Sequence, residues 1–279
     1  MKQKYLAVFT LILACIGTLS AYSIFNIPSQ PNVSTINSEL QPQLKCLTES
    51  STSPIDENGQ LDVLVWNIYK QNRDDWYEEL AKLSESRQLV LLQEASMTES
   101  LKGWVRDSNW HANQVEAFKA MGVSAGVLTV ATESPSLACA YTEQEPWLRL
   151  PKSALFSLYS LSTGEELAVV NIHAVNFSYG VAEYQKQLSA LSTALSEHSG
   201  PIIFAGDFNS WSDERLGEMR KAMLPLELKA VDFDPDERTQ FLNGLALDHV
   251  FYRGMTVDKA EAPMSSASDH NPLIVSFSL

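Results

Sequence analysis

Short apolar runs separated by polar segments recur along most of the chain. Their length and their content of Val, Ile, Leu and Phe predict strands. Apolar residues at helical spacing predict helices, most clearly where Tyr184, Leu188, Leu191 and Leu195 form one stripe that Gly200 ends. The predicted strands are residues 61–68, 88–94, 124–132, 153–161, 166–173, 201–210, 245–254 and 271–279, and the predicted helices are 74–86, 98–105 and 181–200. Strands with interspersed helices predict an α/β fold, either two packed sheets with helices outside or one mixed sheet.

The first sixty residues follow a different pattern. Lys2 and Lys4 precede a run from Tyr5 to Phe25 without charge, which is long enough to span a bilayer and places the rest of the chain across it. An uncleaved anchor is the favoured interpretation, and a cleaved signal peptide or a buried helix are the alternatives. Residues 28–60 are rich in Pro, Ser, Thr, Asn and Gln. The pattern therefore predicts an apolar segment at 1–27, a polar linker at 28–60 and a globular domain at 61–279.

Polar side chains of ligand or acid–base type stand where the predicted strands meet loops. The stretch "IIFAGDFNSWS" is an example, because in an extended chain Asp207 and Asn209 would project to the same side. The others are Asn67, Glu94, Asn171, His173, Asp248, His249, Ser268, Asp269 and His270. One such residue is commonly a turn former, but six strand ends of this kind predict one polar pocket. Crowded carboxylates need a neutralising cation, and oxygen ligands without cysteine suit Mg²⁺ or Mn²⁺.

Composition narrows the possible partners. The 279 residues include 45% hydrophobic and 19% charged residues, and the net charge of −14 argues against stable binding to duplex DNA. Three cysteines, Cys15, Cys46 and Cys139, form no CxxC pair. Cys46 and Cys139 could form a disulfide in an oxidising compartment or remain two separate thiols.

The ordered series "WNI", "LLQE", "NIH", "GDFN", "LDHVF" and "SDHNPL" resembles the endonuclease/exonuclease/phosphatase superfamily. That group includes deoxyribonuclease I, apurinic endonucleases, neutral sphingomyelinases and inositol-polyphosphate 5-phosphatases. The resemblance covers residues 61–278, and "VWNIYKQ", "VNIHAVNFS", "FYRG" and "ASDHNPL" are closer still to its bacterial YafD-like branch. It implies a four-layered α/β sandwich, with two mixed sheets face to face and helices outside, as in deoxyribonuclease I.

The resemblance also implies roles for individual residues. Glu94 matches the chief metal ligand, and Asn67 and Asp269 would lie near the metal, with Asn67 also touching the phosphate. His270 matches the catalytic histidine, which Asp248 would orient. Asp207 and Asn209 would bind the phosphate region and the attacking water. His173 matches the histidine of the deoxyribonuclease and sphingomyelinase branches and would contact the phosphate or assist catalysis.

The implied activity is metal-dependent hydrolysis of a phosphodiester or phosphomonoester, with Mg²⁺ or Mn²⁺ as cofactor. Nucleic acid, a lipid head group and a small phosphate ester remain open as substrates. The alternative is a membrane-tethered binding or adaptor protein without turnover. We expect a monomer, anchored in the inner membrane with its catalytic domain outside the cytoplasm, and a cytoplasmic protein is the alternative. Lys70 and Lys152 could touch a phosphate or be solvated, Trp211 could contact substrate, and His249 is expected to be structural.

Overall fold

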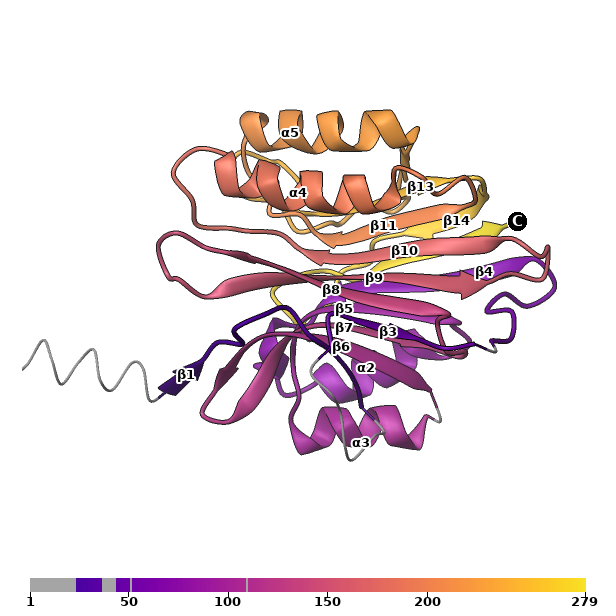
Figure 1. Cartoon of the computed structure of the whole chain (residues 1–279), viewed down its shortest axis with the longest axis horizontal. Helices are drawn as coiled ribbons and strands as arrows, with labels where there is room; N and C mark the ends of the chain where they lie inside the picture. Colours follow the sequence, from indigo (N-terminus) through magenta and orange to yellow (C-terminus); the bar gives the residue numbers. More distant parts are fainter. Residues whose placement is uncertain (1–23, 37–43, 51, 109) are drawn as a thin grey trace, which may run out of the picture.

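Two β-sheets lie face to face, with helices on the outer face of each (Figure 1). The computed structural model describes residues 24–36, 44–50, 52–108 and 110–279. Residues 5–23 of the predicted anchor lie outside this range. Among the described residues no helix is both long and apolar enough to cross a membrane.

The first sheet has the strand order β1–β6–β7–β5–β4–β15–β14, and β2 also pairs with β6. Its central strands β4 and β5 are parallel, whereas their outer neighbours β15 and β7 run antiparallel to them. The strands are β1 (Phe25–Asn26), β2 (Val33–Thr35), β4 (Gln60–Asn67), β5 (Leu89–Ser96), β6 (His111–Ala120), β7 (Val123–Ala131), β14 (Thr256–Glu261) and β15 (Leu273–Ser278).

The second sheet has the strand order β12–β13–β11–β10–β9–β8–β3. Here β10 and β11 are the parallel pair, and β13 and β9 run antiparallel on either side of them. The strands are β3 (Cys46–Thr48), β8 (Leu137–Gln144), β9 (Pro151–Ser160), β10 (Glu166–His173), β11 (Ile202–Asp207), β12 (Lys229–Ala230) and β13 (Asp248–Arg253).

Three apolar layers hold the four structural layers together. Alternate residues of the sheets, such as Val63, Val65 and Val169, pack between them. The first sheet packs outward on α2 (Trp76–Ser84) and α3 (Glu99–Asp107), and the second on α4 (Ala182–Leu195) and α5 (Asp213–Met223). Short 3-10 helices η1 (Tyr69–Gln71) and η2 (Leu224–Leu226) follow β4 and α5. The predicted four-layered α/β sandwich is therefore confirmed.

Several elements differ from the predicted ones. The helix α5 and the strands β6, β8 and β14 were not predicted, and charged or polar residues interrupt the apolar residues of α5, β6 and β14. Strand β11 ends at Asp207, so Asn209 is not part of an extended strand; it adopts a left-handed conformation with φ 46°. The argument that two extended residues project together was therefore wrong for Asn209.

Part of the predicted linker pairs with the sheets. Strand β2 pairs with β6, and β3 pairs with β8, so residues 33–35 and 46–48 extend the two sheets. Cys46 stands opposite Cys139 in the β3–β8 pair, and the two form a disulfide. Phe25, the last residue of the predicted anchor run, pairs with Ala120. The division of the chain at residue 61 stays a prediction.

Candidate active site

The strand directions bring the predicted polar residues to one rim of the sandwich. The parallel strands β4, β5, β10 and β11 all approach this rim with their carboxyl ends, which carry Asn67, Glu94, His173 and Asp207. The antiparallel strand β13 begins there, with Asp248 directly opposite Asp207. β15 also begins there, and His270 lies three residues before its first residue, Leu273. Segments far apart in sequence therefore supply one site.

A β-bulge re-aims Glu94. The register between β5 and β7 shifts between Leu92 and Ala95, and Glu94 has φ 52°. A positive φ is costly for a residue with a side chain, so the surrounding structure must maintain it. The neighbouring Gln93 is fully buried, and its amide donates to Oδ1 of Asn171 on β10 at 2.7 Å. This contact ties the strand that carries Glu94 to the opposite sheet.

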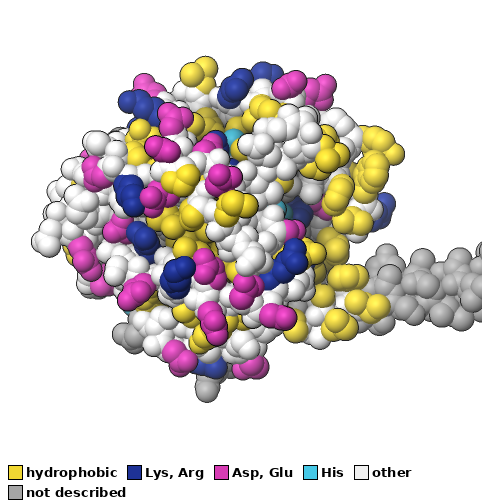
Figure 2. Space-filling model, turned by 180° about the vertical axis from the view of Figure 1, so that it is seen from behind, with side chains coloured by type: hydrophobic (Ala, Val, Ile, Leu, Met, Phe, Trp, Pro, Cys, Tyr) yellow, Lys and Arg dark blue, Asp and Glu magenta, His cyan; other side chains and the backbone are white. Residues whose placement is uncertain are grey.

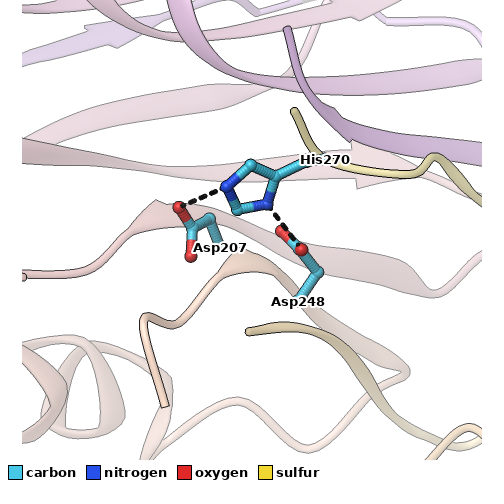
Figure 3. A group of neighbouring side chains, drawn as sticks. All are labelled: Asp207, Asp248 and His270. Carbon is cyan, nitrogen blue, oxygen red and sulfur yellow. Dashed lines mark hydrogen bonds and ion pairs between the residues drawn. The ribbon is translucent and has the colours of Figure 1, made fainter. Parts of the chain in front are cut away.

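His270 lies between two carboxylates (Figure 3). Its Nδ1 is 2.7 Å from Oδ2 of Asp248, and its Nε2 is 4.0 Å from Oδ2 of Asp207. Both carboxylates are almost completely buried. Burial alone would lower the pKa of His270, but the charges of Asp248 and Asp207 outweigh it and raise the pKa to about 10. Burial raises the pKa of Asp207, opposed by the charge of His270. His270 and Asp207 therefore influence each other's protonation.

Two lysines occupy the surroundings of Glu94. Lys70 forms an ion pair with Glu94 Oε2, and Lys152 Nζ lies 3.9 Å from Oε1. Burial would raise the pKa of Glu94, but these two ammonium groups overcome it and hold the pKa below its ordinary value. The sequence left open whether Lys70 and Lys152 lie in the site or are solvated. The structure places both lysines in the site, against Glu94.

His173 is a neutral member of the site. Burial, reinforced by the charges of Lys152 and Lys70, holds its pKa well below the ordinary value. Lys152 Nζ lies 2.9 Å from Nε2 of His173, and Asp207 Oδ2 lies 3.4 Å from the same nitrogen. A neutral imidazole here can orient a phosphate oxygen or a lysine, but it carries no second proton and no positive charge at neutral pH.

The remaining predicted residues lie at different distances from this centre. Asn67 donates to Asp207 Oδ2 at 3.0 Å, and Asn209 donates to the Ala174 carbonyl and, through its backbone, to Asp207 Oδ1 at 2.9 Å. Asp269 is exposed, and its carboxylate accepts a hydrogen bond from Ser268 at 3.4 Å. No contact among the described residues joins Asp269 to Glu94, and its role as a ligand stays a prediction.

Two groups of residues could hold a metal ion. The first is the predicted set around Glu94, with Asn67 and Asp269. The second comprises Asp207, Asp248 and His270, whose ligand atoms all lie within 4.8 Å of one another. Both offer oxygen and imidazole donors without thiolate, which suits a hard or borderline divalent cation.

Arg215 supports the site but was not predicted from sequence. Its buried guanidinium donates to the carbonyl oxygens of Val175, Asn176 and Asn209. It also lies 4.6 Å from the centre of the Trp211 ring, so Trp211 packs on Arg215. In the sequence, Arg215 is a single arginine in an amphipathic segment, and such arginines are usually solvated. The sequence therefore offered no reason to place it in the site.

Comparison with known proteins assigns the family. The profile described as Endonuclease/Exonuclease/phosphatase family matches residues 64–270. The chain belongs to this family. A UPF0294 protein of Vibrio parahaemolyticus is 55% identical over 279 residues, covering 100% of this chain and 99% of its own. A UPF0294 protein of Klebsiella pneumoniae is 44% identical over 226 residues, 81% of this chain and 85% of its own. The resemblance to the family and to its YafD-like branch is confirmed.

Solved structures of the family share the fold. An endonuclease/exonuclease/phosphatase from Beutenbergia cavernae superposes with a TM-score of 0.62 at 16% identity, covering 79% of this chain and 72% of its own. The human Nocturnin catalytic domain, solved with a bound sulfate anion, gives 0.59 at 15% identity over 82% of this chain and 97% of its own. Family membership supports a hydrolase in general.

Proposed function

We propose that this chain is a divalent-metal-dependent phosphoesterase that hydrolyses a phosphodiester or phosphomonoester with Mg²⁺ or Mn²⁺. The observation that carries the proposal is the Asp248–His270–Asp207 row beside Glu94, assembled from separate strands. A histidine held by a carboxylate is a general base, and a neighbouring set of carboxylates can bind a cation. The sulfate bound to Nocturnin is a tetrahedral anion like phosphate, which agrees with this class.

The residues of the chain divide the work between them. Asp248 fixes the ring of His270 through Nδ1, so Nε2 faces Asp207. The unprotonated form of His270, which becomes more populated as the pH rises toward its pKa of about 10, would take the proton of a water molecule near Nε2 and Asp207 as that water attacks phosphorus in line, and Asp248 would stabilise the imidazolium that forms. Lys152, His173 and Asn209 lie beside this position and would bind the phosphate oxygens.

The donor set fits a divalent cation. Glu94 is the charged oxygen ligand, and Asn67 stands opposite Gln93, the neighbour of Glu94, in the β4–β5 pair. The exposed Asp269 would have to turn inward to join them. The ion pairs of Lys70 and Lys152 with Glu94 support a position for positive charge beside this carboxylate. When bound, Mg²⁺ or Mn²⁺ supplies Lewis-acid stabilisation of the negative charge on the phosphate.

We also propose that the protein acts as a monomer outside the cytoplasm, anchored through the run from Tyr5 to Phe25. The Cys46–Cys139 disulfide supports an oxidising location. The net charge of −14 supports a substrate other than duplex DNA.

Hydrolysis of bis-p-nitrophenyl phosphate by the full chain tests the function. We expect turnover with Mn²⁺ and none after chelation.

Glu94→Gln keeps the shape but removes the ligand charge, so Mn²⁺ affinity should fall at least about tenfold. Glu78→Gln, an exposed residue of α2, is the matched control and should bind Mn²⁺ normally. Equal Mn²⁺ affinity of the two variants would show that Glu94 is not a ligand.

The competing interpretation is a tethered binding or adaptor protein that keeps the fold without turnover. The same experiment separates the two. Mn²⁺ binding without hydrolysis of this ester or of a p-nitrophenyl phosphomonoester would favour the adaptor and contradict the enzyme.

A further inference from the structure

A pocket opens directly beside the metal and phosphate residues. Its volume is about 200 Å³, and Glu94, Lys152 and His173 line its inner end. Apolar residues of the wall include Phe118, Leu148, Leu150, Pro151 and Phe177, while Lys70, Glu145, Ser153 and Asn176 also line the pocket. A phosphate at the inner end would therefore leave the adjoining part of the substrate against hydrocarbon.

Exposed hydrophobic side chains surround this pocket. We call them the apolar rim: Ile24, Phe25, Ile27, Met121, Val123, Trp147, Leu148, Phe177 and Tyr179. They are nine of the fifteen large hydrophobic side chains exposed in the described part of the chain. Met121 is 83% exposed and Tyr179 81%. An exposed apolar surface of this kind marks an interaction site.

The rim consists of two groups on opposite sides of the pocket. On one side the backbone of Met121 bonds to Ile24, and the rings of Phe25 and Phe118 lie 5.9 Å apart. On the other side the rings of Trp147 and Tyr179 lie 4.7 Å apart. Figure 2 shows hydrophobic side chains gathered at the end of the molecule where the N-terminal segment joins, above and below a notch.

The sequence identifies what this surface meets. Ile24 and Phe25 of the rim are the last residues of the uncharged run that begins at Tyr5, which is the predicted membrane anchor, and Ile27 follows it. A chain anchored through that run holds the rim against the bilayer. Trp and Tyr at the edge of the rim are the side chains enriched at membrane interfaces. The exposed Arg149 beside Trp147 adds a cation that suits anionic lipid.

We propose that the apolar rim docks on a lipid surface and that the substrate is a membrane-lipid phosphoester whose hydrocarbon part occupies the pocket. This rests on the proposed phosphoesterase function. Water adds across the ester: its oxygen bonds to phosphorus, the P–O bond to the leaving group breaks, and the leaving oxygen ends with a proton. No oxidant or reductant is involved. The competing occupant of the rim is a protein partner. In that case the enzyme would show no preference for lipid substrates.

A series of alkyl p-nitrophenyl phosphodiesters tests the pocket, because every member releases the same p-nitrophenol. The full chain is held in phosphatidylethanolamine/phosphatidylglycerol nanodiscs with Mn²⁺. From ethyl to butyl to octyl we expect kcat/KM to rise about fourfold for each methylene that becomes buried. Leu148→Ser in the pocket wall should flatten this rise. Leu224→Ser is the matched control, because Leu224 is 78% exposed and does not line the pocket.

Hexadecyl p-nitrophenyl phosphate embedded in the same nanodiscs tests the docking. The double variant Trp147→Ser/Tyr179→Ser should hydrolyse this embedded ester at least about tenfold more slowly. Its rate on the water-soluble ethyl ester should stay within twofold of the unmodified chain. Circular dichroism of the variant establishes that it is folded.

The outcomes separate this inference from the function on which it rests. If the ethyl ester is hydrolysed but longer alkyl chains bring no gain, the lipid proposal is overturned. It is also overturned if the rim variant hydrolyses the embedded ester at the normal rate. Either result leaves the phosphoesterase function intact. No hydrolysis of any ester overturns both.

Discussion

Each of the two ring nitrogens of His270 faces a carboxylate. Asp248 holds Nδ1 at 2.7 Å, and Asp207 faces Nε2 at 4.0 Å. Asp248 and Asp207 are paired across β13 and β11, whereas His270 comes from the loop before β15 in the other sheet. The chemistry of the histidine therefore depends on how the two sheets meet.

Asp248 and His270 should act as one unit. His270→Ala should lower kcat by about 10²–10⁴, because the base is lost. Asp248→Asn keeps the side-chain shape but cannot stabilise the imidazolium, so it should also lower kcat substantially. The double variant should be little worse than His270→Ala alone. The measurement is kcat of all four proteins on one phosphodiester.

An exposed histidine provides the control for this cycle. His111 pairs only with Ser134 among its side-chain partners in the described structure, at 2.8 Å, and His111→Ala should leave kcat unchanged. Losses that multiply in the double variant would mean that Asp248 and His270 act independently, and the paired mechanism would have to be abandoned.

At the level of elements, α5 matters to the site through Arg215. Its guanidinium reaches the carbonyls of Val175 and Asn176 in the loop after β10, and the carbonyl of Asn209 in the loop after β11. The rings of Tyr184 and Trp211 lie 4.6 Å from it. One buried side chain therefore fixes both loops that carry phosphate-side groups.

Removing this guanidinium should destabilise the protein. Arg215→Met keeps much of the length but leaves three buried carbonyls without their donor, so we expect a loss of about 3 kcal/mol or more in the free energy of unfolding. Urea denaturation measures it. Arg220→Met, on the exposed face of the same helix, should change stability by less than about 0.5 kcal/mol. A small change for Arg215→Met would contradict a positioning role.

The elements that sequence predicted and those it missed differ in physical character. Buried strands such as β4 and β10 are apolar almost throughout, because both faces of their sheets are covered, and they were recognised. The strand β14 carries Asp258 and Lys259 on an outer edge, where polar residues are normal, so it gives no such signal. Helix α5 hides its single apolar stripe among charges in the same way.

The site shows the same division. Polar residues at strand ends are visible in sequence, because an apolar run stops at them. The bulge at Glu94 is not visible, since a positive φ at a glutamate is imposed by its surroundings. Lys70 and Lys152 were ambiguous for a related reason: only the packing of the two sheets brings them to Glu94.

At the scale of the whole molecule, the disulfide joins the predicted linker to the second sheet. Cys46 and Cys139 are 93 residues apart in sequence and stand opposite each other in β3 and β8. A cross-link over such a long loop restricts the unfolded chain, which favours the folded state. Because cytosolic thiols are kept reduced, this stabilisation is available only outside the cytoplasm.

The location of the domain can therefore be tested through this cysteine pair in living cells. In a Cys15→Ser chain, which leaves only Cys46 and Cys139, acid quenching followed by a maleimide–polyethylene glycol label should show no added mass until the chain is reduced. The run from Tyr5 to Phe25 provides the reason, because positive charge before it directs the rest of the chain across the membrane. A C-terminal alkaline phosphatase fusion should be active and a C-terminal green fluorescent protein fusion dark.

Deleting residues 5–23 is the control: it should leave the pair reduced and reverse the two reporters. A labelled pair with a fluorescent reporter in the intact chain would place the domain in the cytoplasm. In that case the proposed location would be wrong, while the phosphoesterase chemistry would remain to be judged on its own assays.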